Sequence, residues 1–188
     1  MANTYNGNTL ILDSVDVISQ APLWIQKIVL IPNAGGDAAT FKTWGPNGTP
    51  ELHVGGASCT VTSTNQIEST GNFATASVDP GDIIEIYKSS TGNNDGPRNS
   101  WIKDGVYLIN ANADNNTITV QGTPLTNEAN KTYSYRIWTP TEAIYILTPG
   151  TEVMAEVMDF SPAIRVNNLV LSALSSSAKV YVYLAGIV

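Results

Sequence analysis

The sequence has little that would support catalysis or metal binding. It contains one cysteine, Cys59, so no disulfide can form within the chain. It also contains one histidine, His53, and zinc needs three or four clustered ligands, so no zinc site is predicted. A nucleophilic thiol needs a base and a third group that orients the base, and no such third group accompanies this pair. The pattern therefore favours an inert thiol and an ordinary strand histidine.

Charged residues are also scarce, and the basic ones are not clustered. Only 13% of the residues are charged, and 9 Lys and Arg stand against 16 Asp and Glu, for a net charge of −7. Nucleic acids and anionic membranes are bound through clusters of Lys and Arg, so neither is an expected partner. No apolar run approaches the ~20 residues of a membrane-spanning helix. Residues 1–8 lack the basic and apolar regions of a signal peptide, so we expect synthesis in a cytoplasm, without secretion.

Loops rich in Asn and Asp are the remaining source of metal ligands. Asn93, Asn94, Asp95 and Asp104 supply oxygen atoms, but their spacing lacks the terminal Glu of a calcium-binding EF-hand loop. Asn and Asp are also common turn formers, and this explanation is favoured. The sequence predicts no cofactor, no metal and no catalytic residue, and the chain is not expected to be an enzyme. A carboxylate pair that only the fold brings together is left open.

What the sequence has in abundance is β-strand and turn signals. No segment carries a sustained period of 3.6 residues, so an all-β fold is predicted. One pattern of apolar run, breaker and second run occurs twice, at 28–44 and at 169–184. Each copy predicts a hairpin, and a lone hairpin needs a partner sheet. We therefore expect the two copies to share one antiparallel β-sandwich, jelly-roll-like, that is built from both chain ends.

The middle of the chain has closely spaced short strands. Apolar or alternating runs at 83–87, 105–109, 117–120 and 132–138 are separated by turn residues, including Asp114-Asn115-Asn116. Four or five short strands in about sixty residues indicate a small barrel of the SH3 or OB type. The predicted domains are a sandwich body at 1–77 and 139–188, with a polar N-terminal arm at 1–8, and an inserted barrel at 78–138.

The aromatic residues give the candidate binding positions. On the last predicted strand, Val180, Val182 and Leu184 point one way, and Tyr181 and Tyr183 point the other. Tyr is enriched at subunit interfaces, so these two tyrosines are candidate subunit contacts; cross-strand packing on a half-covered sheet is the alternative. Trp101, in a polar loop of the insert, and Tyr87 are candidate exposed binding aromatics, and Trp24 and Trp44 are expected to plug the ends of the sandwich.

Several segments resemble virion proteins of tailed bacteriophages. The opening residues 24–31 and 36–41, and the closing residues 164–171 and 179–184, look like the two ends of small phage virion proteins. The segments 78–84, 105–109 and 116–120 are similar to small barrels inserted in phage structural proteins. These similarities cover about half of the chain.

The resemblance is closest to capsid decoration (cement) proteins. It implies a non-enzymatic virion protein on the capsid surface, with the major capsid protein as its partner and a homo-oligomer, most often a trimer, as its working form. The family has no catalytic residues to carry over, and the insert is then the part that projects or reaches a neighbour.

Two other function classes fit the same composition. A tail, baseplate or fibre component of a phage is the first alternative. A carbohydrate-binding β module, with Trp101 and Tyr87 as stacking residues, is the second. An enzyme with a carboxylate pair in a cleft ranks last.

Overall fold

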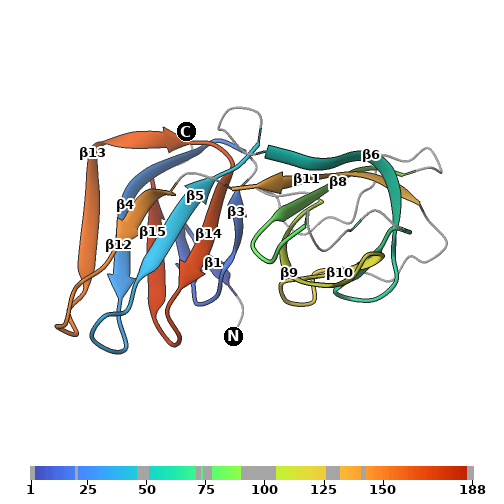
Figure 1. Cartoon of the computed structure of the whole chain (residues 1–188). Helices are drawn as coiled ribbons and strands as arrows, with labels where there is room; N and C mark the ends of the chain where they lie inside the picture. The colour runs from blue at the N-terminus through green and yellow to red at the C-terminus, as the bar shows by residue number, and fades with distance from the viewer. Residues whose placement is uncertain are drawn as a thin grey trace. The chain divides into compact units, whose positions relative to one another are not determined.

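A computed structural model of the chain describes residues 3–19, 21–45, 51–70, 73, 78–89, 105–125, 132–140 and 143–185, with only the backbone for 51–57 and 87–89. All regular structure in these residues is β-strand, and every strand pairing is antiparallel (Figure 1). No helix occurs within the described ranges. The all-β prediction is therefore confirmed.

The chain divides into two compact units, which we call the body and the barrel unit. The body comprises Met1–Thr43 and Glu142–Val188, and the barrel unit comprises Trp44–Thr141. The barrel unit thus begins earlier than the predicted residue 78, because two further strands, β6 (Glu51–Val61) and β7 (Gln66–Glu68), complete the barrel. β6 and β7 pair with each other locally, but their other partners, β11 and β10, lie far along the chain, so local sequence patterns did not place these two strands in the barrel.

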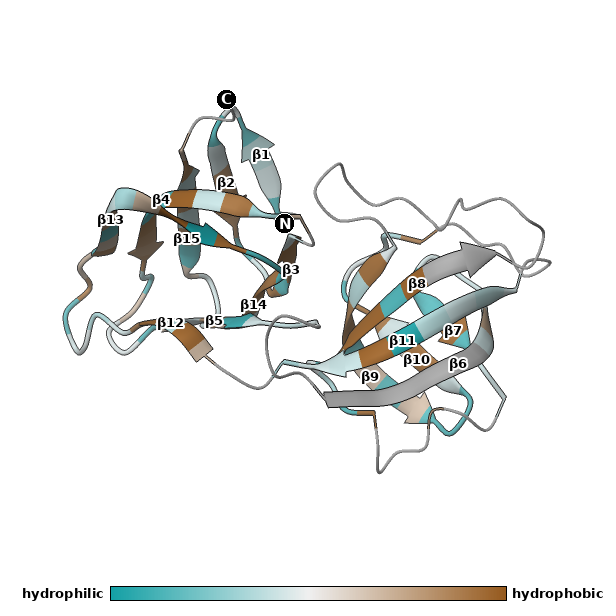
Figure 2. Cartoon of the chain, turned by 90° about the horizontal axis from the view of Figure 1, so that it is seen from above, coloured by the Kyte–Doolittle hydropathy of each residue, from teal (hydrophilic) through white to brown (hydrophobic). Residues whose placement is uncertain are grey.

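The body contains two antiparallel sheets. Sheet A has the strand order β1 (Thr4–Asn6), β2 (Thr9–Leu12), β15 (Lys179–Leu184), β4 (Leu23–Ile31) and β13 (Glu156–Val166). Sheet B has the order β12 (Ala143–Leu147), β5 (Ala39–Thr43), β14 (Leu169–Leu174) and β3 (Asp16–Ser19). In Figure 2 apolar residues alternate with more polar ones over the first half of β4, and the second half is apolar throughout. More buried and less buried residues alternate along most of β4, as expected for a strand with one buried side.

The two repeated segments are not hairpins, which corrects the sequence prediction. β4 and β5 belong to different sheets, and so do β14 and β15. Each segment is instead an arch between the sheets, and the arches pair crosswise: β4 with β15, and β5 with β14. A run of apolar residues around a long breaker does not reveal whether its two strands share a sheet. The prediction that the two copies pack with each other holds in this crossed form.

The arches are fixed by hydrogen bonds at the loops between their strands. Asp37 is buried, and its Oδ2 accepts the backbone N–H groups of Asn33 and Ala34 at 2.7 and 2.9 Å. The two loops also join each other, since Ala38 N–H donates to Ser175 Oγ at 2.8 Å and Ser175 N–H donates to Ala38 O at 3.0 Å. These bonds satisfy backbone groups that the strands leave unpaired where the chain changes sheets.

The predicted N-terminal arm is also corrected. Thr4–Asn6 form β1, which pairs with β2 through a turn at Gly7, where φ is +58°. Asn3 is held as well, because its Oδ1 accepts the N–H groups of Asp13 and Ser14 at 3.0 and 3.2 Å. The segment is therefore an edge strand of sheet A.

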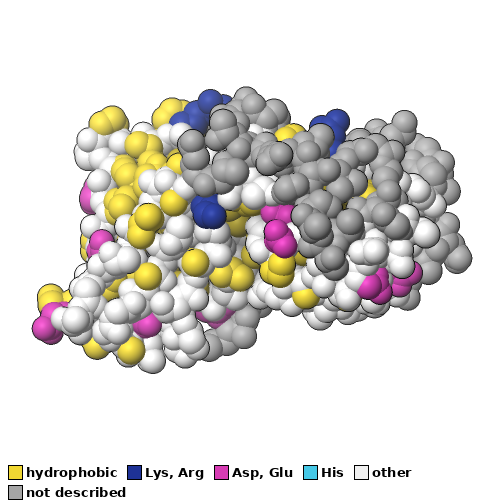
Figure 3. Space-filling model, viewed as in Figure 1, with side chains coloured by type: hydrophobic (Ala, Val, Ile, Leu, Met, Phe, Trp, Pro, Cys, Tyr) yellow, Lys and Arg dark blue, Asp and Glu magenta, His cyan; other side chains and the backbone are white. Residues whose placement is uncertain are grey.

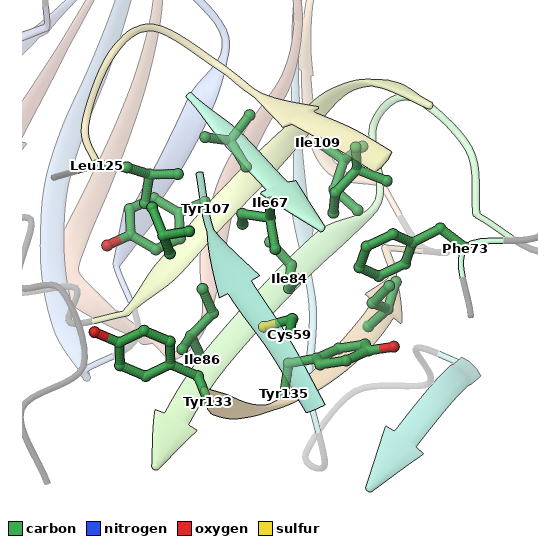
Figure 4. Packing of buried hydrophobic residues seen from close by; sticks show 14 of the residues in the cluster. Cys59, Ile67, Phe73, Ile84, Ile86, Tyr107, Ile109, Leu125, Tyr133 and Tyr135 are labelled. Atoms are coloured by element: carbon green, nitrogen blue, oxygen red, sulfur yellow. The ribbon is translucent and has the colours of Figure 1, made fainter. Parts of the chain in front are cut away.

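The barrel unit is a closed six-stranded barrel. Around it run β10 (Thr117–Val120), β7, β6, β11 (Tyr133–Thr139), β8 (Ile83–Ser89) and β9 (Val106–Asp114). The predicted closed barrel is confirmed, and so is the hairpin at Asp114, whose Oδ1 accepts the Asn116 N–H at 2.7 Å. Its interior is filled by aliphatic and aromatic side chains, among them Phe73, Tyr107, Tyr133 and Tyr135 (Figure 4).

Candidate interaction surface

Exposed apolar side chains are concentrated on the body. Among the side chains that the structure describes, the exposed large hydrophobic ones are all in the body: Tyr5, Trp24, Ile31, Ile146, Val153, Met154, Val157 and Tyr183. Figure 3 shows hydrophobic side chains gathered over the body strands. Contiguous exposed apolar surface on a folded domain commonly marks a contact with another molecule.

The two candidate tyrosines lie on the outer side of sheet A. Val180, Val182 and Leu184 of β15 are buried, whereas Tyr181 is half-buried and Tyr183 is 38% exposed. This alternation was predicted and is confirmed. The role of the two tyrosines in a subunit contact stays a prediction.

An apolar row crosses the outer side of sheet A. Strand register places Ile11 of β2 beside Tyr181, Tyr181 beside Val29 of β4, and Val29 beside Val157 of β13. The four side chains are half-buried or exposed, with Val157 at 55%. Neighbouring strands are ~4.8 Å apart, so this apolar row spans about 14 Å. The sequence did not predict this row, because Ile11, Val29 and Val157 come to lie beside one another and Tyr181 only through strands that pair over long distances.

A polar row runs beside the apolar row. It consists of Thr9, Tyr183, Lys27 and Asp159, again on four adjacent strands. Lys27 Nζ lies 3.6 Å from Asp159 Oδ2 and 6.0 Å from the Tyr183 ring centroid. Both interactions are at the surface, where an ion pair or a cation–π contact contributes at most about 1 kcal/mol. The polar row therefore orients side chains more than it stabilises the fold.

A second apolar surface is the connection between β12 and β13, residues 148–155, which we call the apolar tip. Met154 is 67% exposed, and its neighbour Val153 is also exposed. The tip is anchored, since Gly36 N–H donates to Gly150 O at 2.6 Å. Gly35 lies against the Thr151 carbonyl oxygen, where any Cβ would collide. The exposed side chains are thus presented on a fixed loop.

Cys59, in the barrel interior, is not ionised at neutral pH. Burial raises the pKa of the Cys59 thiol to about 12, so the thiolate is absent near neutral pH. Burial likewise raises the pKa of Tyr135, whose hydroxyl donates to Ser69 Oγ at 3.3 Å. Ser69 in turn donates to Ser58 O at 2.6 Å. These groups form a satisfied chain of hydrogen bonds within the barrel unit.

The two buried acidic residues of the described ranges, Asp37 and Asp82, have structural partners. Asp82 Oδ2 accepts the Asp79 N–H at 2.9 Å, and Asp82 Oδ1 accepts the Thr139 hydroxyl at 2.7 Å. No group of three or more His, Cys, Asp or Glu side chains that could hold a metal ion occurs in the described part of the chain.

Several candidate side chains lie outside the described residues. They are Trp101, the side chains of Tyr87 and His53, and the Asn/Asp loop at 93–104. Trp24, expected as a plug, is 53% exposed beside Arg165 on sheet A, whereas Trp44 is buried. No described helix is long and apolar enough to cross a membrane.

The outer side of sheet A and the apolar tip are therefore the surfaces on which a function can be argued. The chain matches no protein-family model, no curated protein and no solved structure.

Proposed function

We propose that the chain is a non-enzymatic structural protein of a phage particle that decorates the capsid by binding across junctions between major capsid proteins. The observation that carries this proposal is the concentration of exposed hydrophobic side chains on the body. Side chains such as Met154 and Val157 are costly to leave in water and gain free energy when a partner covers them.

The fold supports an assembly role in a second way. The body has open sheets, each with an outer side and edges, and so offers flat surfaces to a neighbour. As part of the same proposal, the body is a jelly-roll-like sandwich and the insert is a barrel of the SH3 or OB type. The particle surface is then the site of action, reached after synthesis in the host cytoplasm.

The mechanism is additive binding. The apolar tip is anchored by the Gly36–Gly150 hydrogen bond, so its exposed side chains reach a partner with little ordering cost. Decoration at many equivalent junctions makes each modest contact persistent through multivalency. The proposed homo-oligomer, for which the resemblance favours a trimer, multiplies the number of tips that one assembly presents.

Mass spectrometry and cryo-electron microscopy of purified particles test this proposal. We expect the chain on the shell, in a copy number comparable with that of the capsid protein. Met154→Glu should lower its occupancy, because a buried unpaired charge is costly. Lys42→Glu, a change of charge on the half-buried surface of β5, serves as the control. A copy number far below that of the shell would indicate a tail, baseplate or fibre component, and absence from particles would refute the proposal.

A further inference from the structure

We infer that the outer side of sheet A binds a second copy of this chain through a two-fold interface, whose axis runs parallel to the strands between β15 and β4. The inference rests on the proposed function in one respect, since both treat the exposed side chains of the body as subunit contacts. It adds the partner for one surface, the register of the contact and its symmetry, which makes the homo-oligomer a dimer rather than the trimer that the resemblance favours.

The apolar row is complementary to itself under this rotation. A half-turn about the axis exchanges the positions of β15 and β4 and those of β2 and β13. Tyr181 of one copy then faces Val29 of the other, and Ile11 faces Val157. In a two-fold interface each such contact is made twice. The row thus buries eight apolar side chains in one contact, which is the composition expected at an interface centre.

The polar row is complementary under the same rotation. Tyr183 faces Lys27 of the second copy, so each ammonium group meets a second aromatic ring. Thr9 faces Asp159, and the Thr9 hydroxyl can donate to the carboxylate. No like charges face each other. A half-turn about an axis across the strands would instead place Lys27 against Ile31 and leave Asp159 without a polar partner, which is costly in a buried contact.

Charge favours this side of the body as the meeting place of two copies. The chain as a whole carries a net charge of −7, which opposes self-association. The outer side of sheet A, in contrast, presents Lys27, Lys179 and Arg165 alongside Asp159. Two acidic chains can therefore meet here without bringing acidic surfaces together.

The edge of sheet A is a poorer contact than its outer side. β13 is an edge strand, but its pairing with β4 breaks between Asp159 and Ile164, and Pro162 lies in the break. A proline cannot donate a backbone hydrogen bond, and such interruptions discourage pairing of edge strands between molecules. Two copies can still associate through the side chains on the outer side of sheet A.

Sedimentation equilibrium of the full chain, from about 1 to 100 μM, tests the pairing. We expect a monomer–dimer equilibrium. Val157→Glu should raise the dimer dissociation constant at least about 100-fold, because each dimer then buries two unpaired carboxylates. Val153→Glu, the same change on the apolar tip, should leave that constant within about twofold. Circular dichroism of both variants confirms that the β fold is retained.

Cross-linking tests the register. Ile11 and Val157 are three strands apart within one chain, about 14 Å, but face each other in the pair. Ile11→Cys and Val157→Cys chains, mixed and treated with a short bismaleimide, should give a covalent dimer. Each variant alone should give little, since Cys59 is buried and the introduced thiols of identical chains lie far apart.

The following results would overturn the inference. A monomer at all concentrations, a trimer without a dimer, or a dimer that Val157→Glu leaves intact excludes this surface or this symmetry. Efficient cross-linking of Ile11→Cys alone excludes the proposed axis. A monomer that is nevertheless found on particles refutes only the pairing, whereas a dimer that is absent from particles refutes only the proposed function.

Discussion

Described aromatic residues of the barrel interior and of the outer side of sheet A differ in their exposure. Tyr107, Tyr133 and Tyr135 of the barrel unit are at most 2% exposed, whereas Trp24 and Tyr183 of the body lie on an outer surface. A closed barrel has one interior, shared by all of its strands, and no free edge. The sheets of the body are open, and the outer side of sheet A carries exposed side chains. Tyr107, Tyr133 and Tyr135 therefore serve the stability of the barrel unit, and Trp24 and Tyr183 on sheet A are available for contact.

The strongest test of this contrast is removal of one ring from each unit. Phe73→Ala should lower the free energy of unfolding of the barrel unit by about 3–5 kcal/mol, because Phe73 is fully buried and lies 5.4 Å from the Tyr135 ring. Tyr183→Ala in the body should cost less than about 1 kcal/mol. Urea denaturation of both variants measures the difference. Equal losses would show that Tyr183 is part of a core.

A smaller effect is expected from the two buried aspartates, one in each unit. Asp37→Ala and Asp82→Ala should each cost about 1–3 kcal/mol, because each removes a buried carboxylate that accepts two hydrogen bonds. Asp37→Asn and Asp82→Asn keep an acceptor oxygen and should cost less. Chemical denaturation measures all four. Loss at Asp37 should also loosen the arch between β4 and β5, seen as faster amide exchange near Ala34.

The sequence predicted which side of a strand is buried and where a short turn lies, but not which strands become neighbours over long distances. Alternation along 180–184 predicted which side of β15 is buried, and Asp114-Asn115-Asn116 predicted the β9–β10 hairpin. Both depend on residues close in the chain. The crossed pairing of the arches and the pairing of β6 with β11 join residues more than sixty positions apart. Local apolar patterns are the same whichever strand becomes the partner.

For the outer side of sheet A, too, the sequence predicted only what depends on residues within one strand. Tyr181 and Tyr183 were identified from alternation within one strand. Val29 and Val157 become their neighbours only through the order of sheet A, so no local signal marked them. Lys27 is one of the unclustered basic residues of the sequence, and its place beside Asp159 likewise follows from register.

Cys59 provides a pH-dependent test that belongs to the barrel unit alone. Its pKa is about 12 in the folded chain against 9.0 for an exposed thiol, because burial disfavours the thiolate. The folded state therefore holds the proton more tightly, so this contribution to stability is complete below pH 9 and is lost as the pH rises from 9 towards 12. At pH 10 the loss is about 1.4 kcal/mol.

The free energies of unfolding at pH 7 and pH 10, compared between the natural chain and Cys59→Ala, isolate this term. The natural chain should lose more stability than the variant over that interval. Native Cys59 should also resist alkylation and react only on unfolding, which makes it a reporter of the barrel unit. Rapid alkylation of the folded chain would contradict its buried position.

The smallest effect is expected on the polar row of the body. Asp159→Asn removes the ion pair with Lys27, but the two side chains are 57% and 40% exposed, so the loss of stability should stay below about 1 kcal/mol. Denaturation is best measured at a concentration where the chain is monomeric. Asn keeps an oxygen that can accept a hydrogen bond from Thr9 of a second copy, so dimer formation should also change little.

Asp159→Lys should instead weaken the dimer, because it removes that acceptor and places a cation there. The free energy of unfolding of the monomer should again change by less than about 1 kcal/mol. A large loss of monomer stability in either variant would mean that the outer side of sheet A holds the fold together, and the contrast between a barrel unit built for stability and a body built for contact would fail.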